Sequence, residues 1–441
     1  MTHFPDTDAI QEMLQAYVDK YQKGVGLIVG LISPAGTEFI SYGRLHVNRP
    51  DPVRPDTLFE IGSVSKIFTA LLLADMAAQG EVALDDPIGR FLPPTVKTPT
   101  YQGQPITLFH LATHTSGLPR NDNDHTSADG SNPYSDYTVE QLYQFLSTYD
   151  LPHSPGSAAA YSNLGFGLLG HILGLKAGLS YDQLVRQRIG QPLHMPDTMT
   201  TLSAEQAGRL AQPHNVVREP VSYWTMPTLA GAGALRSTAA DLLQFVGGSL
   251  GLVDSSLTPV MQQMVQTHYL TGEPNNKKRP LGWGIETKYS PHVIVADGGT
   301  GGSRAFIGFV PEKQIGVVVL CNVATDDNYF IGLNLLEPRF ELPQWQLPRQ
   351  EMTLTAEQLE PYLGRYAEQD SDDVYEVTRE GNQLFVQILG EGRYPVFAGT
   401  PSEFFYKIAD AQHVFLRDHD GRVTHMLTHQ FGKDRLARRV E

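Results

Sequence analysis

The pattern of apolar positions changes period along the chain, and the first change lies near the N-terminus. Residues 7–23 carry apolar side chains at helical spacing, so we expect a helix there, capped by Asp6 or Thr7. Residues 25–32 form a continuous apolar run, residues 38–42 alternate, and the segment between them has the proline and glycine of a turn. We therefore expect a helix followed by a β-hairpin.

A longer, mostly apolar run follows a serine and a lysine that are three positions apart. Ser63 and Lys66 would share one face of a helix, with Cβ atoms about 5–6 Å apart. A lysine amine kept from full solvation can take the serine proton and create a nucleophile. Gly62 allows a sharp turn before the helix, whose free N–H groups favour an oxyanion. The alternative is a capping serine and a surface lysine, but no other lysine has a serine three positions before it.

Two later segments have the residue types that such a nucleophile needs. Tyr161 and Asn163 precede another apolar helical stretch. A tyrosine can donate or accept a proton, and an asparagine can hold the lysine or bind a substrate amide; the alternative is a helix start capped by the asparagine. Residues 292–310 predict two strands joined by glycines, where a free N–H can complete an oxyanion hole. A wide hairpin bend is the alternative there.

The order and spacing of these three segments resemble class C β-lactamases, their penicillin-binding relatives and family VIII carboxylesterases. The resemblance covers about residues 8 to 335, and segments 108–119, 281–284 and 310–319 support it. It implies an α/β fold, with an antiparallel sheet flanked by helices and joined to a helical subdomain. The site would lie between the two parts.

The resemblance also implies a role for each catalytic position. Ser63 would be the nucleophile, Lys66 its base or electrostatic partner, and Tyr161 the base or the acid that protonates the leaving group. The oxyanion hole would be formed by the backbone N–H groups of Ser63 and Gly299. The choice of base between Lys66 and Tyr161 stays open.

The substrate-binding positions depart from the family pattern. Asn163 would orient the substrate and the lysine, and Asn121 stands where β-lactamases often place a substrate-binding glutamine. The third motif usually begins with lysine or histidine, but this chain has Ala296 followed by Asp297, which would repel a substrate carboxylate. Arg304 on the adjoining strand would restore a cation if its side chain points into the cleft; otherwise it is a solvated strand residue.

Other candidate chemistry is weaker. Ser249 lies in a G-x-S-x-G pattern, but a helix precedes it, so its glycines are expected to end that helix. His110 and His114 are four apart without a glutamate or a third ligand, so we predict structural roles and no metal. The single cysteine, Cys321, reads as a buried strand residue. Acyl transfer from a serine needs no cofactor.

Composition limits the partners and the location. A net charge of -15 without a basic stripe excludes nucleic acid and anionic membranes as expected partners. No stretch has the length of a membrane span, and the N-terminus has neither a basic region nor an apolar core. We expect a cytoplasmic protein, or a periplasmic or secreted one if a signal segment has been removed. Assembly into a homo-oligomer stays open.

The length of 441 residues exceeds the roughly 250–300 that one core supports, so we expect two domains. Residues 1–335 would form the hydrolase domain and residues 336–350 a proline-spaced linker. Residues 351–441 show short alternating runs separated by turns, which predict a small antiparallel β domain. That domain resembles the lipocalin-like barrels that follow some serine peptidases of the same family.

The leading prediction is a serine hydrolase that forms an acyl-enzyme at Ser63. Its substrate would be a small ester or an amide of a D-amino-acid peptide, since the missing cation disfavours substrates anchored by a carboxylate. A β-lactamase or a D,D-carboxypeptidase is the alternative within the same chemistry. A penicillin-binding or peptide-binding protein that acylates slowly is the alternative outside enzymes.

Overall fold

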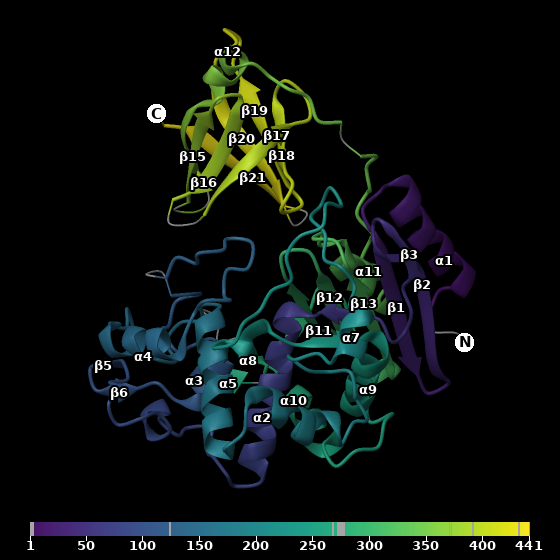
Figure 1. Cartoon of the computed structure of the whole chain (residues 1–441), viewed down its shortest axis with the longest axis vertical. Helices are drawn as coiled ribbons and strands as arrows, with labels where there is room; N and C mark the ends of the chain where they lie inside the picture. The colour runs from purple at the N-terminus through teal and green to yellow at the C-terminus, as the bar shows by residue number, and fades with distance from the viewer. Residues whose placement is uncertain are drawn as a thin grey trace.

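A seven-stranded antiparallel sheet forms one side of the larger part of the molecule, on the right in Figure 1. The computed structural model describes residues 4–122, 125–266, 269–270, 278–348, 350–369, 371, 373–389, 392–430 and 433–440. The strand order is β10-β11-β12-β13-β1-β2-β3. The N-terminal hairpin therefore joins the late strands through the pairing of β1 with β13. The strands are β1 (Gly26–Ser33), β2 (Gly36–His46), β3 (Arg49–Pro52), β10 (Gly284–Glu286), β11 (Val293–Gly299), β12 (Arg304–Val310) and β13 (Ile315–Cys321).

Helices cover both faces of this sheet because its strands are apolar on both sides. Alternate residues of β1 belong to two different clusters, Ile28 and Ile32 to one and Leu27, Val29 and Leu31 to the other. One face packs against α9 (Ala239–Leu250), and the other carries α1 (Thr7–Gln15) and α11 (Asp327–Leu336). The expected first helix is present as α1 and a π-helical turn, Ala16–Lys20.

A helical part lies beside the sheet. Its centre is α2, whose side chains are almost all buried, which explains the apolar run after Ser63. α5 packs against α8, where Gly170 and Gly231 let the two backbones approach. The helices of this part are α2 (Ser65–Ala78), α3 (Leu108–Ala112), α4 (Val139–Thr148), α5 (Asn163–Ala177), α6 (Tyr181–Val185), α7 (Ala204–Gly208), α8 (Ala230–Gly233) and α10 (Thr258–Gln266). The short strands are β4 (Leu58–Glu60), β5 (Thr100–Tyr101), β6 (Gln104–Pro105), β7 (Arg236–Thr238), β8 (Tyr269–Leu270) and β9 (Lys278–Arg279).

The C-terminal part is a closed antiparallel barrel that follows a short helix, α12 (Ala356–Leu359). Its interior is filled by aromatic and aliphatic side chains, among them Tyr366, Phe404 and Met426. With the sheet and the helices described above, this barrel confirms the predicted fold class. The strands are β14 (Gly364–Glu368), β15 (Val374–Glu380), β16 (Gln383–Ile388), β17 (Arg393–Ala398), β18 (Glu403–Tyr406), β19 (Ala411–Arg417), β20 (Val423–Gln430) and β21 (Lys433–Arg439).

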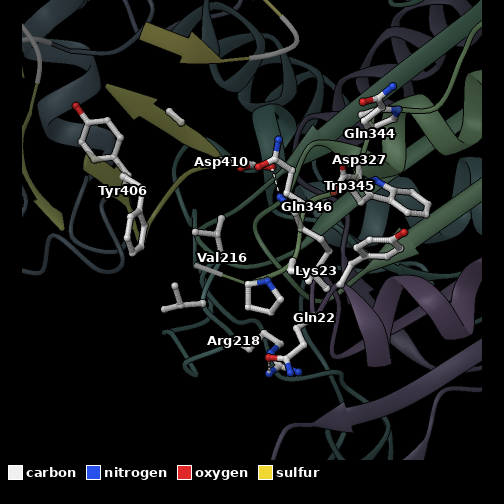
Figure 2. A pocket seen from close by; sticks show the side chains of 17 residues that line it. Gln22, Lys23, Val216, Arg218, Asp327, Gln344, Trp345, Gln346, Tyr406 and Asp410 are labelled. Atoms are coloured by element: carbon white, nitrogen blue, oxygen red, sulfur yellow. Dashed lines mark hydrogen bonds and ion pairs between the residues drawn. The ribbon is translucent and has the colours of Figure 1, made fainter. Parts of the chain in front are cut away.

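A cavity of about 420 Å³ separates the barrel from the larger part of the molecule (Figure 2). Lys23 and Asp410 form an ion pair of 3.0 Å across it, and Val216 N donates a hydrogen bond of 3.0 Å to Lys407 O. Trp345 of the connecting segment packs against the Tyr17 ring, with centroids 4.9 Å apart. These contacts connect the barrel and the preceding segment to the larger part of the molecule.

Several smaller expectations have an outcome in the fold. The pattern around Ser249 lies within α9, so it forms no strand-to-helix elbow. Of its glycines, the left-handed Gly251 ends the helix as expected, whereas Gly247 and Gly248 lie inside it. Cys321 is buried in β13. His110 closes a capping box with Thr107 at the start of α3. None of the helices that the structure describes is long and apolar enough to cross a membrane.

Candidate active site

Ser63 lies in the single 3-10 turn Gly62–Val64 that leads into α2. Gly62 has a φ of 48°, and a Cβ at this position would lie 2.5 Å from the Gly299 carbonyl oxygen. A Cβ at Gly298 would likewise lie 2.6 Å from the Ser63 backbone nitrogen. Only glycine fits at these close approaches. Glycines thus let the start of the nucleophile helix contact the end of β11.

Lys66 is 4% exposed and donates three hydrogen bonds from Nζ. Its acceptors are Ser63 Oγ at 3.0 Å, Asn163 Oδ1 at 2.9 Å and the carbonyl oxygen of Ala232 at 2.7 Å. Burial lowers the pKa of Lys66 well below its usual value, and the charge of Arg120 lowers it further. The Lys66 amine can therefore be neutral, in which case it donates to Asn163 and Ala232 and accepts from the Ser63 hydroxyl.

Tyr161 approaches the same serine from the segment before α5. Its hydroxyl lies 2.6 Å from Ser63 Oγ, and Lys66 Nζ lies 4.7 Å from its ring centroid. Burial by the surrounding protein raises the pKa of Tyr161 to about 12, although the hydrogen bond with Ser63 lowers it. The side chain still keeps 40% of its surface exposed. It can therefore contact both the nucleophile and a substrate.

His114 and Ser162 hold the segment that carries Tyr161. Ser162 N donates to His114 Nδ1 at 3.0 Å, and Ser162 Oγ donates to Pro119 O at 2.6 Å. The same Oγ caps α5 by accepting from Gly165 N at 2.8 Å. The His114 ring lies 4.6 Å from the Tyr161 ring. Ser162 is thus the N-cap residue of α5. The alternative expected from the sequence had assigned this capping position to Asn163.

Asn163 connects the lysine to the polar loop of residues 121–136. Its Nδ2 donates to Asn121 Oδ1 at 3.1 Å and to the Tyr134 hydroxyl at 3.2 Å, while its Oδ1 accepts from Lys66. Tyr134 in turn donates to Asn121 Oδ1 at 3.1 Å. Asn163 and Asn121 therefore lie together beside the nucleophile.

A cleft of about 540 Å³ opens in front of Ser63. Ala296, Asp297 and Glu286 line it, and Lys66 is the one lysine or arginine among its described lining residues. Asp297 keeps access to solvent, but burial by the surrounding protein and the charge of Asp326 raise its pKa. The cleft therefore presents two carboxyl groups to a substrate.

Arg304 does not line this cleft. Its guanidinium donates to Asp326 Oδ1 at 3.3 Å and to the carbonyl oxygens of Thr300 at 2.7 Å and Ser303 at 3.0 Å. These acceptors hold the side chain against its own turn and the start of α11. The expectation that Arg304 restores the missing cation inside the cleft is therefore corrected.

The sequence analysis missed three residues around the site. Glu60 is buried and accepts hydrogen bonds from Thr300 Oγ1 and Trp224 N, each at 2.7 Å. It thereby ties the strand before Ser63 to the glycine-rich junction after β11. Tyr134 and Arg120 come from the loop beside Asn163. The one signal in the sequence was that Glu60 is a charged residue within the otherwise apolar segment 58–61.

Comparison with known proteins places the chain in a family. A family model described as Beta-lactamase matches residues 12–336. The chain belongs to this family. AmpH of Escherichia coli (strain K12), named a D-alanyl-D-alanine-carboxypeptidase/endopeptidase, is 34% identical over 330 residues, which cover 70% of this chain and 83% of AmpH. A β-lactamase of the same organism is 27% identical over 337 residues, which cover 68% of this chain and 85% of that protein.

Solved structures agree with this assignment. The β-lactamase/D-alanine carboxypeptidase of Yersinia pestis, in complex with citrate, superimposes with a TM-score of 0.65 at 28% identity and covers 76% of this chain and 98% of its own. A class C β-lactamase at 22% identity has a TM-score of 0.66 over 77% of this chain and 97% of its own, which supports the fold. Residues 348–438 match a family model described as a domain of unknown function, DUF3471. The chain is a serine hydrolase of the Beta-lactamase family.

Proposed function

We propose that the chain cleaves amides of D-amino-acid peptides and small esters through an acyl-enzyme on Ser63. The observation that carries the proposal is the position of Ser63 Oγ, 3.0 Å from Lys66 Nζ and 2.6 Å from the Tyr161 hydroxyl. A nucleophile within hydrogen-bond distance of two groups that can move protons is the arrangement that acyl transfer needs.

The pKa directions favour one assignment of the two proton-moving groups. The lowered pKa of Lys66 makes its neutral amine available as the base that takes the Ser63 proton. The pKa of Tyr161, about 12, keeps its hydroxyl protonated near neutral pH, so it can protonate the leaving group. The oxyanion would accept hydrogen bonds from the backbone N–H groups of Ser63 and Gly299. Water then releases the acyl group.

The charge of the cleft supports a preference among substrates. Ala296 provides no cation, and Asp297 and Glu286 add negative charge, so a free carboxylate next to the scissile bond is disfavoured. A carboxypeptidase substrate carries such a carboxylate, whereas an endopeptidase substrate or a simple ester lacks it. Of the two activities in the name of AmpH, the second fits this cleft better. β-Lactams also carry a carboxylate, so we rank activity on β-lactams below the cleavage of peptides without a free carboxylate and of simple esters.

The first experiment compares the wild-type protein with Ser63→Ala on an N-acylated D-alanyl-D-alanine and on its C-terminal amide. We expect faster cleavage of the amide by the wild type and no cleavage of either by the variant. Equal rates for wild type and variant would refute Ser63 as the nucleophile. An acyl adduct that stays on the wild type for hours without product release, detected by mass spectrometry, would favour the slow-acylating binding protein.

The cytoplasmic location stays a prediction.

A further inference from the structure

Arg120 is an arginine beside the active site that the acyl-transfer scheme does not use. It is exposed, and its guanidinium carbon lies 5.0 Å from the centroid of the Tyr161 ring. Among the residues that the structure describes, no side chain or backbone group forms a hydrogen bond or an ion pair with this guanidinium. The backbone of Arg120, by contrast, is fixed, because its carbonyl oxygen accepts from Asn163 N at 2.9 Å and from Leu164 N at 3.2 Å. A fixed backbone thus presents to the tyrosine a cation that has no ion-pair partner among the described residues.

The proposed role of Tyr161 creates a need for such a cation. When Tyr161 gives its proton to a leaving group, negative charge develops on its oxygen in a partly buried place, where an isolated anion is costly. Ala296 adds no positive charge there, and the charge of Asp297 raises the pKa of Tyr161. Lys66 holds the proton taken from Ser63 at this stage and supplies one cation beside Tyr161. A second cation near Tyr161 must come from another element than β11.

The titratable and charged groups around Tyr161 come from four parts of the chain. They are Lys66 on α2, His114 after α3, Arg120 and Tyr134 on the following loop, and Asp297 on β11. Lys66 changes its charge during the reaction if it acts as the base. A guanidinium stays protonated at every pH at which the protein is folded. Arg120 is thus the permanent cation among these five groups.

We propose that Arg120 is a positioning residue that stabilises the anionic form of Tyr161 during leaving-group departure. This inference rests on the proposed function. In the reaction, the proton of Ser63 passes to Lys66 as the bond from Oγ to the acyl carbon forms. The proton of Tyr161 passes to the leaving oxygen or nitrogen as its bond to the acyl carbon breaks. The proton held by Lys66 then restores the Tyr161 hydroxyl, so one proton moves in total from Ser63 to the product.

The choice of leaving group makes this role measurable. Ethoxide must be protonated as it leaves, whereas p-nitrophenolate leaves as a stable anion with almost no protonation. The experiment measures kcat/KM, which reports on acylation, for the ethyl and the p-nitrophenyl esters of butyric acid. The proteins are the wild type, Arg120→Gln, Arg120→Lys and the remote control Arg186→Gln. Arg186 is a suitable control because its side chain is 58% exposed and its nearest carboxylate partner is 4.0 Å away.

We expect Arg120→Gln to lower kcat/KM for the ethyl ester roughly three- to thirtyfold, the range for a unit charge about 5 Å from a developing anion at a solvent-exposed position. When rates are compared on the plateau above the acidic limb of each protein's pH profile, the p-nitrophenyl ester should change less than twofold. Arg120→Lys should recover part of the loss, and Arg186→Gln should match the wild type. Because Arg120 also lowers the pKa of Lys66, the acidic limb of the pH profile should move to higher pH in Arg120→Gln.

Two outcomes would overturn the inference. If both esters lose the same factor in Arg120→Gln, the residue acts in binding or folding; if neither changes, it has no part in the reaction. Failure of the proposed function gives a different result, namely a Ser63→Ala variant as active as the wild type. Labelling of Ser63 by a fluorophosphonate probe verifies that each Arg120 variant keeps an assembled site.

Discussion

Replacing Gly62 with alanine should separate the nucleophile turn from β11. The new Cβ would lie 2.5 Å from the carbonyl oxygen of Gly299 and 2.6 Å from its nitrogen, and real Cβ atoms essentially never come within 3.0 Å of such atoms. The turn and the strand must therefore move apart by about 0.5 Å, the difference between 3.0 and 2.5 Å. This shift affects the two N–H groups that would bind the oxyanion.

The substitution should reduce both catalysis and stability. Loss of one oxyanion donor costs about 10²- to 10³-fold in kcat, so a partial displacement should lower kcat/KM for an ester roughly ten- to a hundredfold. The φ of 48° at Gly62 adds a strain of about 1–2 kcal/mol for alanine. That strain lowers the midpoint of thermal unfolding by a few degrees.

Gly80, just after α2, provides a matched control. Its φ is 72°, but no atom lies within 4 Å of the Cβ position, so Gly80→Ala carries the same kind of backbone strain without the clash. We expect both variants to lose stability and Gly62→Ala alone to lose activity. Equal activity in the two variants would refute the argument that contact between Gly62 and Gly299 sets the geometry of the oxyanion hole.

Three further predictions concern the charged and proton-moving groups. Lys66→Met should lower kcat/KM by about 10²- to 10⁴-fold. In the wild type, kcat/KM should increase as the pH rises past the lowered pKa of Lys66 and should be low at more acidic pH, because the base acts as the neutral amine. A pH-independent rate would contradict this role. Tyr161→Phe should slow an ethyl ester more than a p-nitrophenyl ester, and equal losses would argue against its role as the acid. Asp297→Asn should raise the rate ratio of free-carboxylate to amide peptides roughly fivefold, for about 1 kcal/mol of repulsion, whereas the exposed control Asp254→Asn should leave it unchanged.

The sequence was most informative where spacing alone determines a contact. Ser63 and Lys66 are three residues apart, and the 3.0 Å hydrogen bond between them follows from helical geometry. The antiparallel strands of the C-terminal domain also follow from local pattern, because they alternate and are separated by turns, whereas their closure into a barrel was expected from the family resemblance. The meeting of Asn163 with Lys66, 97 residues away in sequence, was expected from the family resemblance, since no local rule implies it.

Side-chain direction was the main quantity that the sequence did not determine. Alternation along β12 gives the face of Arg304, but its orientation depends on Asp326, which lies 22 residues later. Arg120 left no signal, because an arginine in a polar loop is ordinary and its relation to Tyr161 arises only when two loops meet. Glu60 also depends on a distant partner, Thr300.

Ala296 and Arg120 are best understood together. A tyrosine that must lose a proton requires a nearby positive charge, but that charge can come from any side of the ring. A cation in place of Ala296 on β11 would also line the cleft and attract a substrate carboxylate. The guanidinium of Arg120 lies over the Tyr161 ring and outside the lining of the cleft. A cation over the Tyr161 ring stabilises the tyrosine anion without attracting a carboxylate into the cleft, and Asp297 disfavours carboxylates. The protonation of the leaving group and the preference among substrates therefore depend on different residues and can change independently.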